Sequence, residues 1–432
     1  MKQIIDNGLD DSNTMDVGKS SISLNTLHAS DFDVPTLAFL TLFSYWYLFP
    51  QHFFPIIFQL KIPVICTSIC IICSMMQFRF ERYRDVKAEL ISLLILGGFF
   101  FFSRYFVKDI DSSKFYTQEH FHAVFVGMVF FVNFQKPNKL HLFTVLLIAY
   151  GTFVAFIGFK EGGLIWSHDF LKDQNQISTF MAMVIPVTIF YSFYTRKKSY
   201  KILCYLCVAM QVVLIIRSFS RTGFVALVTV SFFIILNSQK KIFLLLLLLL
   251  SVVLVCNYAP KRFFHEVNSL NEGVEEATAH ARVRFWERAW RMFQDSPIIG
   301  HGIGQYPVEN TRFRGSAELD RATDSLVCHS NWFQILSELG LVGFVCYLVI
   351  WLKYFKAWHL INKNPFRYSL ANLNSDEESF YKNISTGFAI GMISFIVAGS
   401  FINIMIFAYY YNFIFFMMTL KASWLSKVEV AT

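Results

Sequence analysis

The sequence predicts an all-α polytopic membrane protein with about twelve transmembrane helices. Three observations predict this class: 55% of the 432 residues are hydrophobic, only 16% are charged, and the apolar residues come in long runs. A soluble globular domain carries about 25% charged residues. A helix of about 20 apolar residues crosses the hydrocarbon core of a bilayer. Runs of this character include residues 140–159 and 242–256.

The apolar runs predict twelve spans joined by short loops. They are 36–52, 55–78, 88–106, 120–134, 140–159, 177–194, 200–216, 222–237, 241–258, 331–352, 384–401 and 403–421. The first two are the least regular, because Pro50, Pro55 and Lys61 interrupt them. A long span to Leu60 followed by a short one from Ile62 would give the same count.

Basic residues are distributed unequally between the two sides of this predicted bundle. With a cytoplasmic N-terminus, the inside loops and the two ends hold 21 lysines and arginines, and the short outside loops hold seven. Cytoplasmic loops carry such an excess in membrane proteins. The bias therefore predicts that both ends are inside. It also explains the net charge of +8 without a nucleic-acid partner.

The spans divide the chain into five parts. Residues 1–34 are predicted to be a disordered cytoplasmic tail, residues 35–257 hold helices one to nine, and residues 331–425 hold helices ten to twelve. Residues 426–432 form a short cytoplasmic C-terminal tail. Between the helical parts, residues 258–330 form one large outside loop, far longer than an ordinary connection. Its tryptophans, glycines and helical periodicity predict short amphipathic helices.

The segment 282–293 of this loop has the pattern of an amphipathic helix lying at the outer membrane surface. At 3.6 residues per turn, one apolar stripe contains Trp286, Ala289, Trp290 and Phe293. The opposite face, which we expect to be solvated, contains Arg284, Arg288 and Arg291. Arg282 is different because it falls on the tryptophan stripe, where a guanidinium is costly unless it meets an anion. Arg282 is therefore a candidate anion-binding residue.

Two further arginines lie in a tight outside turn, Arg217-Ser-Phe-Ser-Arg221-Thr-Gly223. Their place on the outside runs against the general charge bias. A guanidinium binds phosphate oxygens in a bidentate manner and stays charged at physiological pH. Phosphate binding is the functional interpretation of Arg217 and Arg221, and anchoring at the membrane surface is the alternative.

A histidine precedes the helix that re-enters the membrane, in the segment His329-Ser-Asn331. Histidine is the side chain best suited to proton transfer near neutral pH. A lone histidine at a membrane surface also occurs in purely structural roles, so only its context makes His329 a candidate. Ser330 or Asn331 would cap the helix.

Other polar features receive structural interpretations. The Gly300-His-Gly-Ile-Gly304 segment follows no strand, so we interpret it as a turn that closes the preceding helix. His120 and His122 are expected to be ordinary outer-face residues. The pair Cys204 and Cys207 is interpreted as small apolar residues inside a helix.

Taken in chain order, these segments resemble a known family. The order is a Ser-Arg pair opening a late span, a loop arginine four residues before a tryptophan, a Ser-Pro-x-x-Gly-x-Gly segment, and a histidine followed by glycines at Gly340 and Gly343. This pattern, with twelve spans, is similar to the O-antigen ligase and polymerase superfamily, and most similar to the O-antigen ligases. The motif likeness covers residues 217–351.

The resemblance implies a metal-independent, inverting glycosyltransferase without a cofactor, multi-pass in the bacterial inner membrane, with an active site on the periplasmic side. The donor would be an undecaprenyl-diphosphate-linked glycan and the acceptor a lipid A–core sugar. Membrane lipids would be further partners, and no nucleic acid would be bound. Arg221 and Arg282 match the arginines associated with the donor diphosphate, and Arg217 is an added diphosphate-binding candidate. His329 matches the histidine associated with the acceptor. The usual His-Asn reads His-Ser-Asn here, which leaves the role of Asn331 open.

Three alternatives differ in acceptor or in class. An O-antigen polymerase would use a second lipid-linked glycan as acceptor, and a protein O-oligosaccharyltransferase would use a protein. A lipid-linked sugar flippase would carry polar groups near the midplane of the membrane. Here the informative polar residues gather at one face, and Glu338, near a span end, is expected to snorkel to the surface.

Overall fold

The computed structural model describes the greater part of the chain as helix. The residues it describes are 31–48, 61–77, 80–163, 165, 171–237, 241, 274–315, 327–363, 368–369 and 373–430. Within them the strand content is one antiparallel pair, β1 (Tyr368–Ser369) with β2 (Glu429–Val430). The prediction of an all-α class is confirmed for this part of the chain.

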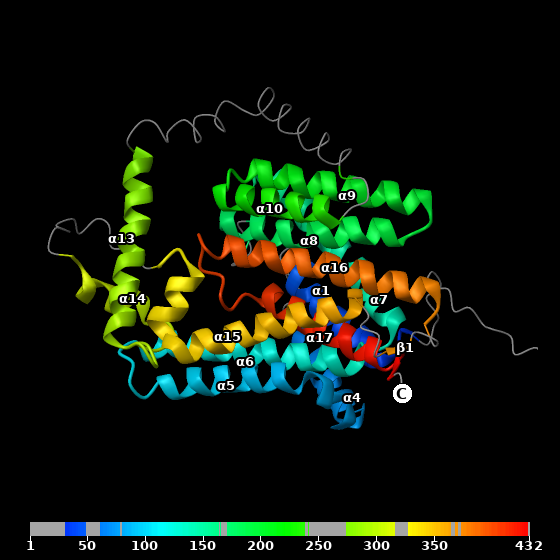
Figure 1. The fold of residues 1–432 in the computed structure, drawn as a ribbon, viewed down its shortest axis with the longest axis horizontal. Helices are drawn as coiled ribbons and strands as arrows, with labels where there is room; N and C mark the ends of the chain where they lie inside the picture. Colours follow the sequence, from blue (N-terminus) through cyan, green and yellow to red (C-terminus); the bar gives the residue numbers. More distant parts are fainter. Residues whose placement is uncertain are drawn as a thin grey trace, which may run out of the picture.

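The helices follow one another with short connections (Figure 1). Their bounds are α1 Val34–Leu48, α4 Ile62–Gln77, η2 Phe80–Val86, α5 Lys87–Ser103, α6 Ile110–Asn133, α7 Pro137–Lys160, α8 Gln174–Tyr194, α9 Lys198–Arg217, α10 Arg221–Asn237, α13 Val274–Asp295, α14 Tyr306–Glu309, η4 Asn310–Phe313, α15 Asn331–Lys363, α16 Ser375–Ala398 and α17 Ala408–Leu425.

Six helical stretches in the described ranges are long and apolar enough to cross a membrane. They are Tyr83–Ser103, Pro137–Lys160, Gln174–Tyr194, Lys198–Arg217, Asn331–Lys363 and Ser375–Ala398. Shorter apolar helices occur at Val34–Tyr45, Ile62–Met76 and Arg221–Asn237. Several helices that could cross a membrane are therefore present. The count of twelve stays a prediction, and the expected span 241–258 lies outside the described residues apart from Lys241.

α8 is the central helix of the bundle. In its most apolar stretch 89% of the residues are buried, against 22% in α9. It packs against α9, α10 and α16, which surround it in Figure 1. α9 therefore presents most of its side chains outward, as a lipid-facing helix would.

The other part of the core is rich in aromatic rings. Phe130, Phe143 and Phe416 stack at centroid distances of 4.6 to 6.1 Å. Close approach at Gly127 makes this possible, because a Cβ there would lie 2.0 Å from the Phe415 ring. Small residues let membrane helices approach closely in the same way.

His120 lies inside this bundle, which corrects its expected place on the outer face. The side chain is fully buried, and its Nδ1 lies 2.7 Å from the Tyr411 hydroxyl. Its Nε2 lies 3.0 Å from the Leu93 carbonyl, so this ring nitrogen carries the proton and donates it. These two partners come from α17 and α5, which are distant in the chain, so the sequence alone does not predict them.

The connections 104–109, 218–220 and 399–407 meet at one end of the bundle, which we call the site end, together with the described residues 161–163, 171–173, 296–315 and 327–330. Hydrogen bonds join several of them, as from Ser220 to Asn175 and from Asn331 to Gly399. α13 lies across this end, nearly perpendicular to the long helices, at the left of Figure 1.

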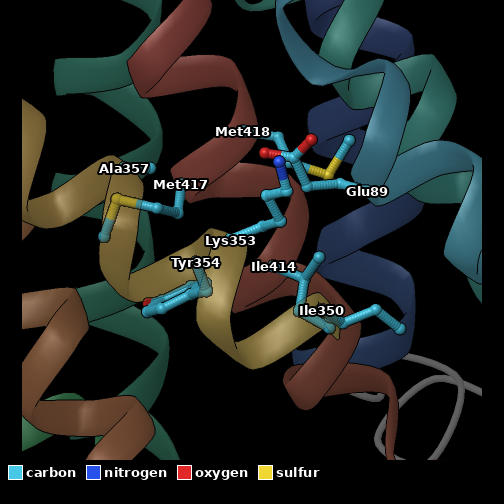
Figure 2. Close-up of a pocket in the computed structure, with 8 residues that line it drawn as sticks. All are labelled: Glu89, Ile350, Lys353, Tyr354, Ala357, Ile414, Met417 and Met418. Carbon is cyan, nitrogen blue, oxygen red and sulfur yellow. The ribbon is translucent and has the colours of Figure 1, made fainter. Parts of the chain in front are cut away.

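Toward the other end of the bundle lies a small, largely apolar pocket between α5, α15 and α17 (Figure 2). Lys353 extends toward the buried carboxylate of Glu89, which pairs with Lys421 at 3.1 Å. Beyond this pocket, Lys139 donates to both carboxylate oxygens of Asp33 at 2.7 and 2.9 Å. These charges neutralise one another within the fold, and the candidate residues of the sequence all lie at the site end.

Candidate active site at the end of the helical bundle

The turn between α9 and α10 places Arg221 at the first position of α10. The Ser220 hydroxyl accepts a hydrogen bond from the Gly223 amide at 3.0 Å, so Ser220 caps the helix. It also donates to the Asn175 side chain at the start of α8, at 2.7 Å. The serine of the Ser-Arg pair therefore fixes Arg221 relative to α8, while the Arg221 side chain itself is exposed.

Arg217, at the end of α9, has a different environment. Its guanidinium lies over the Phe159 ring of α7, 4.6 Å from the centroid. The turn after α7 also packs closely on its backbone, since a Cβ at Gly163 would lie 2.4 Å from the Arg217 carbonyl oxygen. Arg217 is thus at the same turn as Arg221, but its described contact is with α7.

α13 carries Arg282, which is half-buried and close to Arg221. Burial lowers the pKa of the Arg282 guanidinium, and the positive charge of Arg221 lowers it further. Arginine remains protonated at any physiological pH. Two cations from separate elements therefore lie close enough for their charges to interact, one half-buried and the other exposed.

His329 adjoins this pair of arginines. Its ring lies beside that of Phe285, one turn along α13 from Arg282, at a centroid distance of 6.3 Å. Burial lowers the pKa of His329, and the Arg282 charge lowers it further. The charge of Asp173 acts in the opposite direction and raises it. Arg282 therefore links the three candidate residues, since its charge acts on His329 and the Arg221 charge acts on Arg282, and Asp173 acts on His329 as well.

The backbone around His329 is held from both sides. His329 itself has a φ of 54°, a left-handed conformation that is uncommon for a non-glycine residue. Two residues later, the Asn331 amide donates to the Gly399 carbonyl at 2.7 Å, and the Asn331 side chain accepts from the Ile404 amide at 2.7 Å. Asn331 is therefore the residue that attaches the start of α15 to the connection between α16 and α17.

The glycine-rich segment 300–304 is hydrogen-bonded to the backbone of α15, and we call this attachment the joint. Its amides are already used: His301 donates to the Ser337 carbonyl at 3.0 Å and Gly302 to the Glu338 carbonyl at 2.8 Å. Gly300 and Gly340 have φ values of 66° and 59° and lie against each other's chain segments. A Cβ at Gly340 would lie 2.5 Å from the Ile298 carbonyl oxygen. The spaced glycines of the family pattern allow this contact.

Glu338 lies inside this joint, which corrects the expectation that it snorkels. It is fully buried, and its carboxylate accepts from the amides of Gly304 at 3.0 Å and Tyr306 at 2.8 Å. Next to it, the buried Gln305 side chain accepts from the amides of Lys108 and Asp109 at 3.1 and 2.9 Å. Two buried side chains therefore hold the loop segment against α15 and the α5–α6 connection.

The face that α13 buries is not the one that the sequence suggested. Arg288 was expected on the solvated face, yet it is fully buried and donates to the Asn310 side chain at 3.1 Å. Trp290 of the apolar stripe, which was expected to face the membrane, is 45% exposed at the protein surface. The loop packs its own α14 and η4 onto α13, with Tyr306 in the centre of the contact. That partner could not be inferred from helical periodicity alone.

Sequence reasoning missed Asp173, Glu338 and Arg288 as parts of this region. An aspartate just before a helix is a recognisable N-cap signal, so the place of Asp173 could have been found. Its nearness to His329 could not, because the two belong to connections far apart in the chain. Glu338 and Arg288 gave no distinguishing signal.

A comparison with known protein families covers the central part of the chain. Residues 206–348 match the family model described as O-antigen ligase, and the matched stretch contains Arg217, Arg221, Arg282 and His329. A search of the curated proteins gives no match. This stretch of the chain is therefore similar to the O-antigen ligase family, and it lies among helices apolar enough to cross a membrane.

Proposed function

We propose that the protein is an O-antigen ligase, which transfers a glycan from undecaprenyl diphosphate to a sugar hydroxyl of lipid A–core on the periplasmic side of the inner membrane. The observation that supports this most is the meeting of Arg221, Arg282 and His329 from three separate elements. The guanidinium of Arg282 is half-buried, that of Arg221 is exposed, and the two positive charges act on each other. A diphosphate offers the multiple charges and oxygens that both can bind.

The reaction follows from this arrangement. The acceptor hydroxyl oxygen attacks C1 of the donor sugar from the face opposite the diphosphate, so the configuration at C1 inverts. The C1–O bond breaks, and its electron pair stays on the departing diphosphate oxygen. Arg221 and Arg282 stabilise that developing charge. His329, with its lowered pKa, accepts the hydroxyl proton.

The remaining residues support this chemistry. Arg217 is exposed at the same turn as Arg221 and adds a third positive charge for the diphosphate. The donor is already activated by its diphosphate leaving group, so side chains alone carry the proposed steps.

Replacement of Arg282 tests the assignment. Purified Arg282→Ala should transfer glycan from a polyprenyl diphosphate about 10²–10³-fold more slowly than wild type, because one charge-stabilising donor is lost. Arg291→Ala is the matched control on α13, since Arg291 is partly exposed and donates to the Phe313 carbonyl. Near-normal turnover of Arg282→Ala, measured as glycolipid product per minute, would sink the assignment.

The acceptor separates a ligase from a polymerase of the same superfamily. A strain that lacks the protein should still make long lipid-linked glycans but should not attach them to lipid A–core. Loss of the long chains themselves would indicate a polymerase. Transbilayer movement of the donor by the protein in liposomes without acceptor would indicate a flippase.

A further inference from the structure

α15 is interrupted near its start, at Gly340. The φ and ψ angles of this residue are 59° and −158°, so the chain leaves the helical conformation there. Such an interruption leaves amides and carbonyls without helical partners. The loop supplies partners for the amides, because Leu341 donates to the Pro297 carbonyl at 2.9 Å and Val342 to the Ile298 carbonyl at 3.1 Å. The loop therefore caps the second part of α15.

The length of α15 determines how deep this interruption lies in a bilayer. The first charged residue of α15 after Gly340 is Lys353, which extends toward Glu89 in Figure 2. It follows Gly340 by 13 residues, which is about 20 Å of helix. The hydrocarbon core of a bilayer is about 30 Å thick. With Lys353 at one edge of the core, Gly340 lies about 10 Å inside the other edge.

Backbone groups at this depth have no water to bind, so protein must satisfy them. The loop meets this requirement only by reaching into the membrane. The turn that does so consists of Pro297, Ile298 and Ile299, which we call the tip. Ile298 is 65% exposed and Ile299 is 43% exposed. Turns in water favour glycine, asparagine, aspartate and serine, so two adjacent exposed isoleucines indicate an apolar environment.

The tip adjoins an exposed apolar stripe of α15. Residues three and four positions apart share one face of a helix. The members of this stripe, all exposed, are Leu341, Val345, Leu348 and Leu352. A spanning helix presents such a face to lipid. Since the Leu341 amide is bonded to the Pro297 carbonyl, the tip extends this face toward the site end.

We propose that the tip is inserted among the acyl chains of the bilayer, in the leaflet on the side of the site end. The depth of the interruption places the tip below the surface of the hydrocarbon. The exposed isoleucines give it the apolar character that acyl chains require, and the stripe of α15 makes it continuous with the surface that faces lipid.

Insertion of the tip positions α13 relative to the membrane. The chain on both sides of the tip is attached to the last turn of α13, because the Ser296 amide and the His301 Nε2 donate to the Met292 carbonyl at 3.1 and 3.0 Å. α13 lies across the site end in Figure 1 and carries Arg282. Arg282 is thereby kept near the membrane surface, where the diphosphate of a lipid-linked donor lies. This consequence, unlike the insertion itself, rests on the proposed transferase function.

The first experiment tests insertion and needs no substrate. The purified full-length protein is placed in liposomes of phosphatidylethanolamine and phosphatidylglycerol, without donor. A phenyl diazirine that dissolves in the hydrocarbon is added and activated by light, and the carbene reacts with side chains that contact acyl chains. Trypsin cleavage after Arg291 and Arg312 gives one peptide that holds both the tip and Val308. Fragmentation by mass spectrometry then locates the label.

The label should be found at Ile298 and Ile299, as it should at Val345 of the α15 stripe. Val308 is the internal control: it is 38% exposed, and the next residue, Glu309, pairs with the exposed Lys108 at the water side. It should carry no label above background. Label at Val345 without label at the tip overturns the inference. Equal label at the tip and at Val308 also overturns it.

The second experiment tests the consequence for the reaction. Ile298→Asp places in the tip a carboxylate, which hydrocarbon strongly disfavours. In liposomes this variant should lower kcat/KM for a long-chain polyprenyl-diphosphate donor by about tenfold or more, mainly through KM. Ile298→Leu, which stays apolar, should keep the wild-type value, and so should the matched control Val308→Asp.

A wild-type kcat/KM in Ile298→Asp would overturn the positioning of α13 by the tip. An equal loss in Val308→Asp would overturn it as well, because the effect would then not depend on the membrane. Failure of the wild type to transfer glycan would instead overturn the proposed function, and the carbene label would still report whether the tip is inserted.

Discussion

Backbone strain is concentrated at the site residues. Two of the three non-glycine residues with positive φ in the described part of the chain are Phe219, at 53°, and His329, at 54°. Such conformations cost about 1–3 kcal/mol each and persist only where the surroundings enforce them. Phe219 lies two residues before Arg221, so strain accompanies both motifs of the site. The fold thus maintains these two turns in one conformation.

The lowered pKa of His329 makes a prediction about pH. A base with a lowered pKa stays neutral, and active, at pH values where an ordinary histidine of pKa about 6.5 is already protonated. The acid limb of kcat/KM should therefore lie below pH 6.5, and activity should fall as the pH drops through it. In Arg282→Gln the residual activity should show an acid limb closer to 6.5, because one repelling charge is gone. A wild-type limb above 6.5 would contradict the proposed role of His329.

Residue chemistry explains which site residues the sequence could reveal. Arg282 is identifiable because it breaks an apolar stripe, and Arg221 because it breaks the charge bias of the loops. Asp173 breaks no pattern, since an acidic residue before a helix is ordinary. Its charge acts on His329 from a distant connection, which local sequence does not encode.

Helical periodicity in the sequence predicts that a helix exists but does not predict which of its faces is buried. The expected helix at 282–293 is part of α13, Val274–Asp295, but its buried face is set by Tyr306 and Phe313 of the same loop. Periodicity gives the existence of a helix, while its orientation depends on the partner. Three arginines of α13 are equivalent in the sequence, and packing buries only Arg288 fully.

The joint between the loop and α15 gives a prediction at this scale. Gly340→Ala should lower both the unfolding temperature and the transfer rate, because φ is 59° and the added Cβ would lie 2.5 Å from the Ile298 carbonyl oxygen. The backbone strain alone costs about 1 kcal/mol or more. Gly98→Ala in α5 is the control, since nothing lies within 4 Å of its Cβ and alanine favours helix. Thermal unfolding in detergent compares the two variants. Equal unfolding temperatures would contradict the close packing of Gly340 against the loop.

At the scale of the molecule, helix cores were predictable and helix ends were less so. The expected spans 177–194 and 200–216 match α8, Gln174–Tyr194, and α9, Lys198–Arg217, within a few residues. The expected spans 120–134 and 331–352 are parts of longer helices, α6, Ile110–Asn133, and α15, Asn331–Lys363. Apolar runs reveal only the segment that fits the bilayer, and polar residues continue the helix beyond it. The packing of connections into one site end follows from tertiary contacts alone.

The side of the membrane on which the site lies is the last prediction. The charge bias of the loops predicts that Glu161 and Phe219, in connections of the site end, are periplasmic, and that Lys197, between α8 and α9, is cytoplasmic. Alkaline phosphatase fused after Glu161 or Phe219 should be active, because it folds only in the oxidising periplasm. A fusion after Lys197 should be inactive. The donor diphosphate would reach Arg282 only from the side that carries the active fusions, so phosphatase activity at Lys197 in place of Glu161 would contradict both the topology and the proposed reaction.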